Sequence, residues 1–219
     1  MLFNSLEFLL FFPVVTFLYF VFPHRFRWVL LLVSSCFFYM AFIPAYILIL
    51  GLTIDIDYVA AIFIEKKQGK MRKTLLIISI VSTCAVLFIF KYFGFFNNIT
   101  ASVANFFNLN YPIPVLHIIL PLGLSFHTFQ SLSYVIEVYR GNQKAERHFG
   151  IYALYVMFYP QLVAGPIERP QHLLHQFRER HEFSYGRVVD GLKLMAWGMF
   201  KKIVIADRLA FTVNLVYSE

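Results

Sequence analysis

The sequence predicts an all-α protein, a polytopic bundle of membrane helices with one re-entrant segment. Of its 219 residues, 59% are hydrophobic and 14% are charged, and the mean hydropathy is +0.67. A soluble domain contains about 45–50% apolar and about 25% charged residues, so this excess does not fit inside one soluble core. The apolar residues also gather in runs of roughly the 20 residues that a membrane-spanning helix needs.

Five of these runs are as long as a membrane span or nearly so. The first has no Lys or Arg before it and no small-residue cleavage site after it, so it is not a signal peptide and should remain as a helix. Pro44 marks the turn between the second and third runs. The five runs are residues 6–22, 28–43, 45–64, 74–93 and 115–138.

Three less regular segments follow, at residues 151–164, 188–200 and 203–217. The segment 151–164 has basic residues on both sides and contains Pro160, which makes it too short and too broken to cross a bilayer comfortably. We predict that it is re-entrant or deeply buried in protein. Lipid cannot satisfy irregular backbone, so this segment implies a hydrated cavity or close protein packing. No soluble domain interrupts the runs, which predicts a single transmembrane domain over residues 1–219.

The basic residues predict how the chain is oriented. They follow the first, third and fifth runs, whereas the connections around Pro44 and at residues 94–114 have none. Lys and Arg accumulate in short cytoplasmic loops, so we expect a multi-pass protein of the cell (inner) membrane with its N-terminus outside. This topology also explains the net charge of +7, and no nucleic-acid-binding motif accompanies it. The bases are Arg25, Arg27, Lys66, Lys67, Lys70, Arg72, Lys73, Arg140, Lys144 and Arg147.

A polar stripe lies within the fifth run, in the sequence LPLGLSFHTFQSLSYVIEVYRG at residues 120–141. At 100° per residue, five positions fall within an arc of about 80°, which should face a protein or water interior. Ionisable residues inside a membrane usually mark a functional path. The alternative is a satisfied hydrogen-bond network between helices, with Gly123 permitting close packing. The stripe consists of Gly123, His127, Gln130, Tyr134 and Glu137.

Two carboxylates lie near the middle of the third run, at Asp55 and Asp57. Residues two apart on a helix point about 200° from each other, so these two cannot form a carboxylate pair for acid–base work. At most one faces the cavity, and we predict that it is Asp57. The alternative is an Asp bonded to a neighbouring helix or to a Lys.

Neither the cysteines nor the histidines predict a metal site or a bound cofactor. Cys36 and Cys84 are single residues inside apolar runs and are expected to be small core residues. His172 and His175 have i, i+3 spacing, but no carboxylate or Cys with ligand geometry accompanies them. Their sequence, QHLLHQFRERHEF, favours an interfacial helix with Leu173, Leu174 and Phe177 towards lipid.

Three stretches together resemble a known family. They are LPLGLSFHTFQSLSYVIEVYRG at 120–141, YPQLVAGPIERP at 159–170 and GLKLMAWGMFKKIVIAD at 191–207, preceded by the opening FNSLEFLLFFPVV. Their order and spacing resemble the membrane-bound O-acyltransferases, in the branch of the alginate O-acetyltransferase membrane subunits. The resemblance covers the entire chain.

The resemblance implies a helical body that encloses a funnel. Through it, an acyl group passes from a cytoplasmic donor, acetyl-CoA or another acyl thioester, to a hydroxyl acceptor on the other side. The implied partners are the lipid bilayer, this donor, and a polysaccharide such as alginate or its carrier, reached through extracytoplasmic acetyltransferases. The expected funnel-lining residues are Asp57, His127, Gln130, Tyr134, Glu137, Gln161, Glu168 and Arg169.

The chain also departs from the family pattern. His127 stands where relatives have an aromatic residue such as Tyr, so we do not expect it to be the catalytic histidine. The family's active-site histidine lies downstream of the KKIVIAD stretch, so this chain is expected to be the N-terminal half of the enzyme, without a catalytic residue. A non-enzymatic transporter or lipid flippase component is the competing hypothesis, because it equally explains broken helices and midplane carboxylates.

Overall fold

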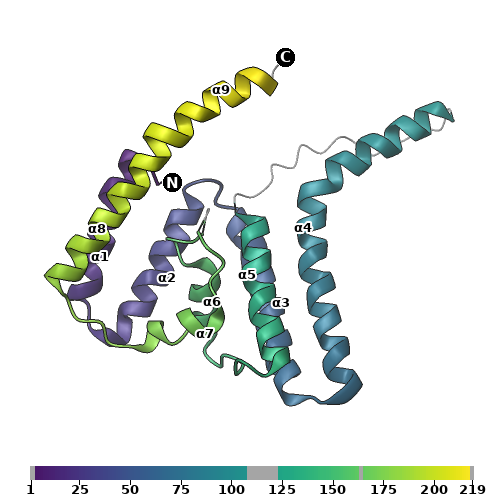
Figure 1. Cartoon of the computed structure of the whole chain (residues 1–219). Coiled ribbons are helices and arrows are strands. Elements are labelled where there is room, and N and C mark those ends of the chain that lie inside the picture. Colours follow the sequence, from purple (N-terminus) through teal and green to yellow (C-terminus); the bar gives the residue numbers. More distant parts are fainter. Residues whose placement is uncertain (1–2, 108–122, 163–164, 218–219) are drawn as a thin grey trace. The chain divides into compact units, whose positions relative to one another are not determined.

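The computed structural model is helical through most of the residues that it describes, 3–107, 123–162 and 165–217 (Figure 1). No β-strand occurs within these ranges, so the predicted all-α class is confirmed. The helices are α1 (Leu6–Val21), α2 (His24–Met40), α3 (Tyr46–Lys66), α4 (Gly69–Phe106), α5 (Leu124–Arg140), α6 (Phe149–Met157), α7 (Pro170–Leu173), η1 (Gln176–Arg178), α8 (Tyr185–Phe200), η2 (Lys201–Ala206) and α9 (Asp207–Tyr217).

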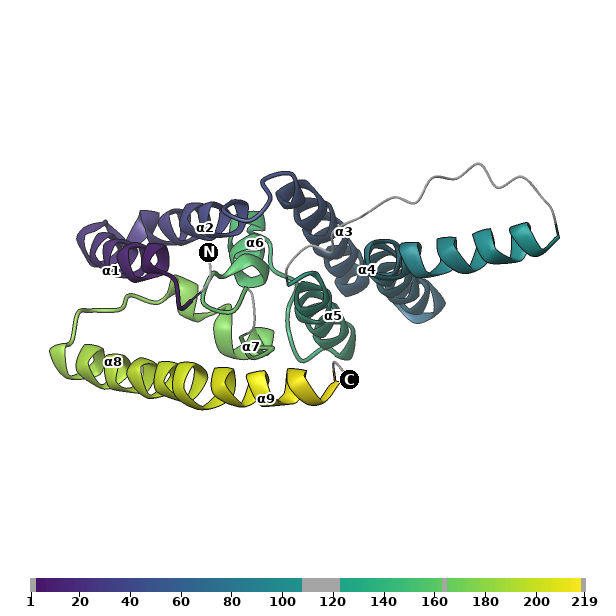
Figure 2. The same ribbon diagram turned by 90° about the horizontal axis from the view of Figure 1, so that it is seen from above.

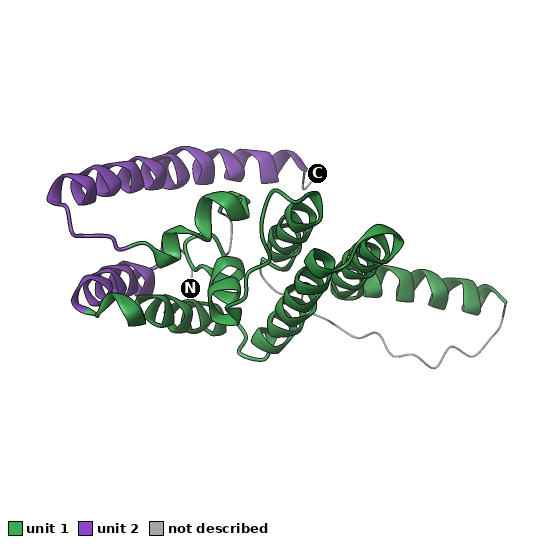
Figure 3. Cartoon of the chain, turned by 90° about the horizontal axis from the view of Figure 1, so that it is seen from below, with its two compact units in different colours: residues 1, 22–179 green, residues 2–21, 180–219 purple. Residues whose placement is uncertain are grey.

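The chain divides into two compact units (Figure 3). Unit 1 contains α2 to η1, within residues 22–179, and unit 2 combines residues 2–21 with 180–219. That both belong to one transmembrane domain stays a prediction.

Unit 1 is an antiparallel helix bundle. Consecutive helices from α2 to α5 run in opposite directions, and α3, α4 and α5 pack against one another (Figures 1 and 2). The helix α6 contacts α2, α3 and α5. Among the described helices, α3 and α4 are long and apolar enough to cross a membrane, in agreement with the predicted membrane bundle.

The helix α6 occupies most of the segment predicted to be re-entrant or buried. It has nine residues, so it extends for only about 14 Å and cannot cross a hydrocarbon layer of about 30 Å. Residues 151–157 are all buried, and Pro160 follows shortly after the helix. The backbone of α6 is therefore surrounded by protein, as the prediction required; residues 163 and 164 lie outside the described ranges.

The helix α4 corrects the predicted boundary after the fourth run. A connection was expected from residue 94, but α4 has 38 residues and continues to Phe106. Phe95, Ile99, Val103 and Phe106 recur at helical spacing, with no proline or charge between them, so the sequence keeps an amphipathic helix going. The rest of that connection and the start of the fifth run, residues 108–122, lie outside the described ranges.

Two further predictions need correction. The segments 188–200 and 203–217 are not separate, because the six-residue π-helix η2 joins α8 to α9 within unit 2. The expected interfacial helix around His172 is instead the four-residue α7 and the short 3-10 helix η1. Leu173 and Leu174 are buried in protein and do not face lipid.

Candidate functional site

The polar stripe of α5 lies against α6. His127, Gln130 and Tyr134 are at most 1% exposed, and Glu137 is 9% exposed. The His127 Nδ1–H donates to the Val156 carbonyl at 3.3 Å, and the Gln130 side-chain amide donates to the Tyr155 carbonyl at 3.5 Å. This burial agrees with the arc predicted from the sequence; a funnel-lining role stays a prediction.

Tyrosine rings fill the space between α5 and α6. The ring centroids of Tyr134 and Tyr152 lie 4.5 Å apart, and that of Tyr155 lies 6.2 Å from that of Tyr134. The Tyr134 hydroxyl accepts a 2.7 Å hydrogen bond from the Glu146 backbone N–H. Ser131 and Tyr152 add a hydroxyl pair at 3.3 Å. The interior of unit 1 is therefore polar as well as aromatic.

Asp57 is buried, while Asp55 is exposed. One oxygen of Asp57, Oδ1, accepts hydrogen bonds from the hydroxyls of Ser79 at 2.7 Å and Thr83 at 2.9 Å, both on α4. Its Oδ2 has no hydrogen-bond partner among the described residues. Asp57 thus links α3 to α4; a funnel-lining role for it stays a prediction.

At the end of the stripe, Glu137 joins α5 to α7. Its Oε2 accepts hydrogen bonds from the side-chain amides of Asn142 at 2.9 Å and Gln171 at 2.6 Å. Its Oε1 lies 3.5 Å from the Arg140 guanidinium. The carboxylate is therefore held by three partners around the C-terminal end of α5.

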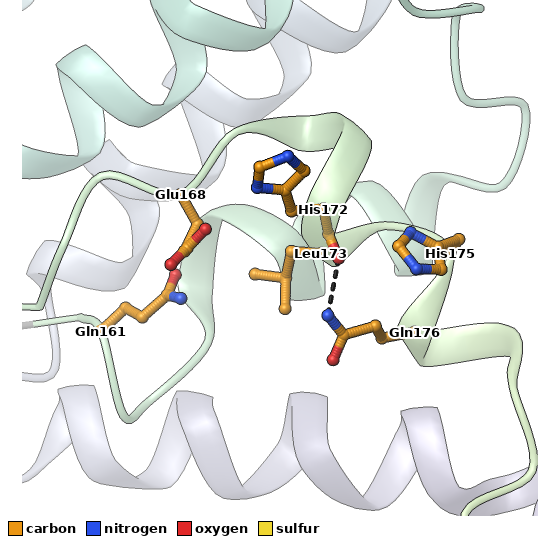
Figure 4. Close-up of a pocket in the computed structure, with 6 residues that line it drawn as sticks. All are labelled: Gln161, Glu168, His172, Leu173, His175 and Gln176. Atoms are coloured by element: carbon orange, nitrogen blue, oxygen red, sulfur yellow. Dashed lines mark hydrogen bonds between the residues drawn. The ribbon is translucent and has the colours of Figure 1, made fainter.

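A pocket of about 570 Å³ opens beside α7 (Figure 4). Two predicted funnel residues, Gln161 and Glu168, line it, whereas Arg169 does not and is exposed. The His175 ring donates to the Gln171 carbonyl at 2.9 Å and turns away from His172, so the two rings do not converge as a metal site would require (Figure 4). The lining residues are Gln161, Glu168, His172, Leu173, His175 and Gln176.

Side chains of the bundle hold this pocket segment in place. The Tyr155 hydroxyl donates to the Glu168 carbonyl at 2.8 Å. Arg178 pairs with Glu146, a carboxylate that is only 5% exposed and that also accepts the His148 backbone N–H at 2.8 Å. Sequence reasoning missed Glu146; the only signal was a lone acidic residue in a basic loop.

The basic loops of unit 1 meet at one end of the bundle, the lower end in Figure 1. Arg72, near the start of α4, donates to the carbonyls of Val138 at 3.2 Å and Tyr139 at 2.6 Å and so caps α5. A cation there also complements the negative end of the helix dipole. Arg147 pairs with Glu65 from the end of α3. Side chains thus lock the ends of α3, α4 and α5 together.

Comparison with curated proteins finds relatives along nearly the whole chain. It is 34% identical over 213 residues to the "Probable alginate O-acetylase AlgI" of Pseudomonas aeruginosa, covering 96% of this chain and 41% of that protein. The protein of the same name from Azotobacter vinelandii is 33% identical over 216 residues, covering 96% and 42%. The "Peptidoglycan O-acetyltransferase" of Helicobacter pylori is 33% identical over 218 residues, covering 86% and 40%.

The chain therefore spans about two fifths of the length of these relatives. No protein-family model matches the chain, and no solved structure matches it significantly.

Proposed function

Because the chain belongs to the membrane-bound O-acyltransferase family, we propose that it forms part of an enzyme that O-acetylates an exported polysaccharide. The donor is acetyl-CoA or another acyl thioester on the cytoplasmic side, and the acceptor is a sugar hydroxyl on the other side. The relatives named for alginate and for peptidoglycan are about equally similar, at 34% and 33% identity. The acceptor is therefore assigned by class, as a polysaccharide or its carrier, and it is reached through extracytoplasmic partner acetyltransferases.

The structure adds one observation to the names of the relatives. The buried polar stripe of α5 packs against α6, a helix too short to span a membrane. A path for a polar substrate across a bilayer must be lined by polar groups, which lipid tails do not have. The helices α5 and α6 supply such groups. The polar pocket beside Gln161 and Glu168 adjoins these helices through the bond from Tyr155 to Glu168.

We assign the donor side to the basic end of unit 1, in a multi-pass protein of the inner membrane with its N-terminus outside. His24 connects this end to the pocket segment, because its ring lies 3.1 Å from the Arg178 carbonyl. On this assignment, the pocket segment is tied to the end of the bundle on the side where acyl thioesters are made.

Acyl transfer requires a base that takes the proton from the sugar hydroxyl while its oxygen attacks the thioester carbonyl. The carbon–sulfur bond then breaks, and the thiol leaves with a proton. Two of the described histidines are poorly suited to this role. His127 is buried, with Nδ1 bonded to Val156, and His148 accepts the Ile151 N–H at 3.3 Å at the start of α6. We propose that this chain supplies funnel wall and that the base lies outside it.

A chimera tests the proposal. Residues 1–219 would replace the matching region of the Pseudomonas aeruginosa relative, and O-acetyl groups on secreted alginate would be measured in cells lacking their own copy. We expect acetylation to return, because the walls around the path are equivalent. A chimera that reaches wild-type abundance in the membrane and restores no O-acetyl groups would refute the assignment.

A further inference from the structure

We propose that residues 94–106, the second part of α4, form a membrane-contact helix on the bilayer surface opposite the basic end, with their apolar face in the lipid. This inference concerns how the chain sits in its membrane and does not depend on the acyl-transfer proposal. The bilayer itself covers this exposed apolar face.

The length of α4 is the first reason. Its 38 residues extend for about 57 Å, whereas a hydrocarbon core is about 30 Å thick. Residues 69–73 carry three bases and belong to the basic end, and the apolar run 74–93 is by itself long enough to span. The remaining 13 residues, 94–106, must then lie beyond the hydrocarbon core or along its surface.

The direction in which these residues point is the second reason. Phe95, Ile99 and Val103 are 61%, 46% and 50% exposed, whereas Asn97 and Ala104, on the opposite arc, are 4% and 9% exposed. Asn98, Thr100 and Ser102 are exposed beside this strip, so the helix presents outwards a run of large apolar side chains flanked by polar ones. A helix in water buries such a run against protein, so a lipid surface is the environment that this one fits.

Continuity with the spanning part identifies the occupant. At 100° per residue, Ile77, Val81 and Phe88 fall on the same arc as Ile99 and Phe106, and all of them are exposed. The spanning part of α4 presents this stripe to the bilayer, and the stripe continues without a break into residues 94–106. Figures 1 and 2 show that α4 bends and that its second part leads away from the bundle.

The charge of residues 94–106 predicts which lipids this helix binds. Residues 94–106 contain no Lys, Arg, Asp or Glu. Most interfacial helices combine apolar burial with attraction between basic residues and anionic headgroups, and here only the apolar contribution is present. Binding should therefore be the same on zwitterionic and on anionic bilayers.

Fluorescence quenching by depth-specific lipids tests the inference on the full chain. In a Cys36→Ala, Cys84→Ala background, single cysteines would replace Ile99 and Val103, and as matched controls Asn98 and Ala101. Each would carry an environment-sensitive fluorophore in phosphatidylcholine vesicles with a spin-labelled quencher near the headgroup or near the chain end. A label at Leu52 of α3, which is 54% exposed, marks deep insertion, and one at Lys70 marks water. The four labelled positions would be compared only in preparations where the label at position 52 is quenched by the deep quencher, because this shows that the protein has inserted.

We expect the headgroup-level quencher to reduce fluorescence at positions 99 and 103 at least threefold more than at 98 and 101, with little effect of the deep quencher. Adding phosphatidylglycerol should not change this ratio. Equal deep quenching at all four positions would mean that the helix stays inside the bilayer. No quenching at 99 and 103 would mean that protein or water covers the face, and quenching only with anionic lipid would mean electrostatic contact. Each of these three results would overturn the inference.

Discussion

The Gln171 side-chain amide of α7 donates a 2.6 Å hydrogen bond to the carboxylate of Glu137 at the end of α5. This bond connects the last residue of the polar stripe to the segment that lines the pocket. A hydrogen bond to a charged group contributes about 1.5–3 kcal/mol, so it can decide where α7 lies.

Replacing Glu137 by Leu should therefore lower acyl transfer. In the chimera, we expect Glu137→Leu to lose about tenfold in acetylation, since a loss of about 1.4 kcal/mol in positioning corresponds to that factor. Leu132→Ala, which alters packing on the same helix, should lose less. Wild-type activity for Glu137→Leu at equal membrane abundance would show that the stripe has no functional part.

The topology can be read with accessible cysteines in the Cys36→Ala, Cys84→Ala background. A cysteine replacing Gln68, in the basic connection between α3 and α4, should react with a membrane-impermeant maleimide only from the cytoplasmic side. A cysteine replacing Asn98 should react from the outside. Labelling of position 68 from the outer face of intact cells would reverse the predicted orientation.

Gly123 should be intolerant of a side chain. Its φ of +77° lies in the left-handed region, and a Cβ there would collide with the Leu162 carbonyl oxygen. We expect Gly123→Ala to destabilise the chain by about 1–3 kcal/mol in chemical unfolding in detergent. Gly51→Ala is the matched control: it lies inside α3 with open space around it, and should be neutral or stabilising by about 0.5–1 kcal/mol. Equal shifts for the two variants would contradict this account of Gly123.

Asp57 should act through its hydrogen bonds and not through its charge. Asp57→Asn keeps an oxygen that can accept from the Ser79 and Thr83 hydroxyls, so its free energy of unfolding should stay near that of the wild type. Asp57→Leu leaves two buried hydroxyls without their acceptor and should cost about 1–3 kcal/mol. If both substitutions destabilise equally, the charge itself is required.

The chain alone should not transfer acyl groups. In membranes containing only residues 1–219, radiolabel from an acetyl thioester should reach a polysaccharide no faster than in empty membranes. His127→Ala and His172→Ala serve as paired variants, because the first lies in the stripe and the second in the pocket. Transfer above the control that is abolished by either substitution would place the chemistry within this chain.

Local periodicity explains what could be predicted from the sequence. The burial of the stripe on α5 and the contrast between Asp57 and Asp55 both follow from 3.6 residues per turn, which is a property of neighbouring residues. The short buried segment around α6 was likewise evident from its length and from Pro160. The continuation of α4 past residue 93 differs from the predicted connection at 94–114, because Phe95, Ile99 and Val103 keep the helical spacing.

By itself, the sequence determined the helical class, the membrane-length runs and the side of each helix that turns inward, because all three depend on spacing along one chain. Only the tertiary structure decided which residues build the pocket and what holds it. Glu146 pairs with Arg178 and Glu137 with Gln171, partners 32 and 34 residues apart that no helical period relates. Such pairs matter only after the packing of the chain removes the two carboxylates from water, because a buried carboxylate without a partner is costly.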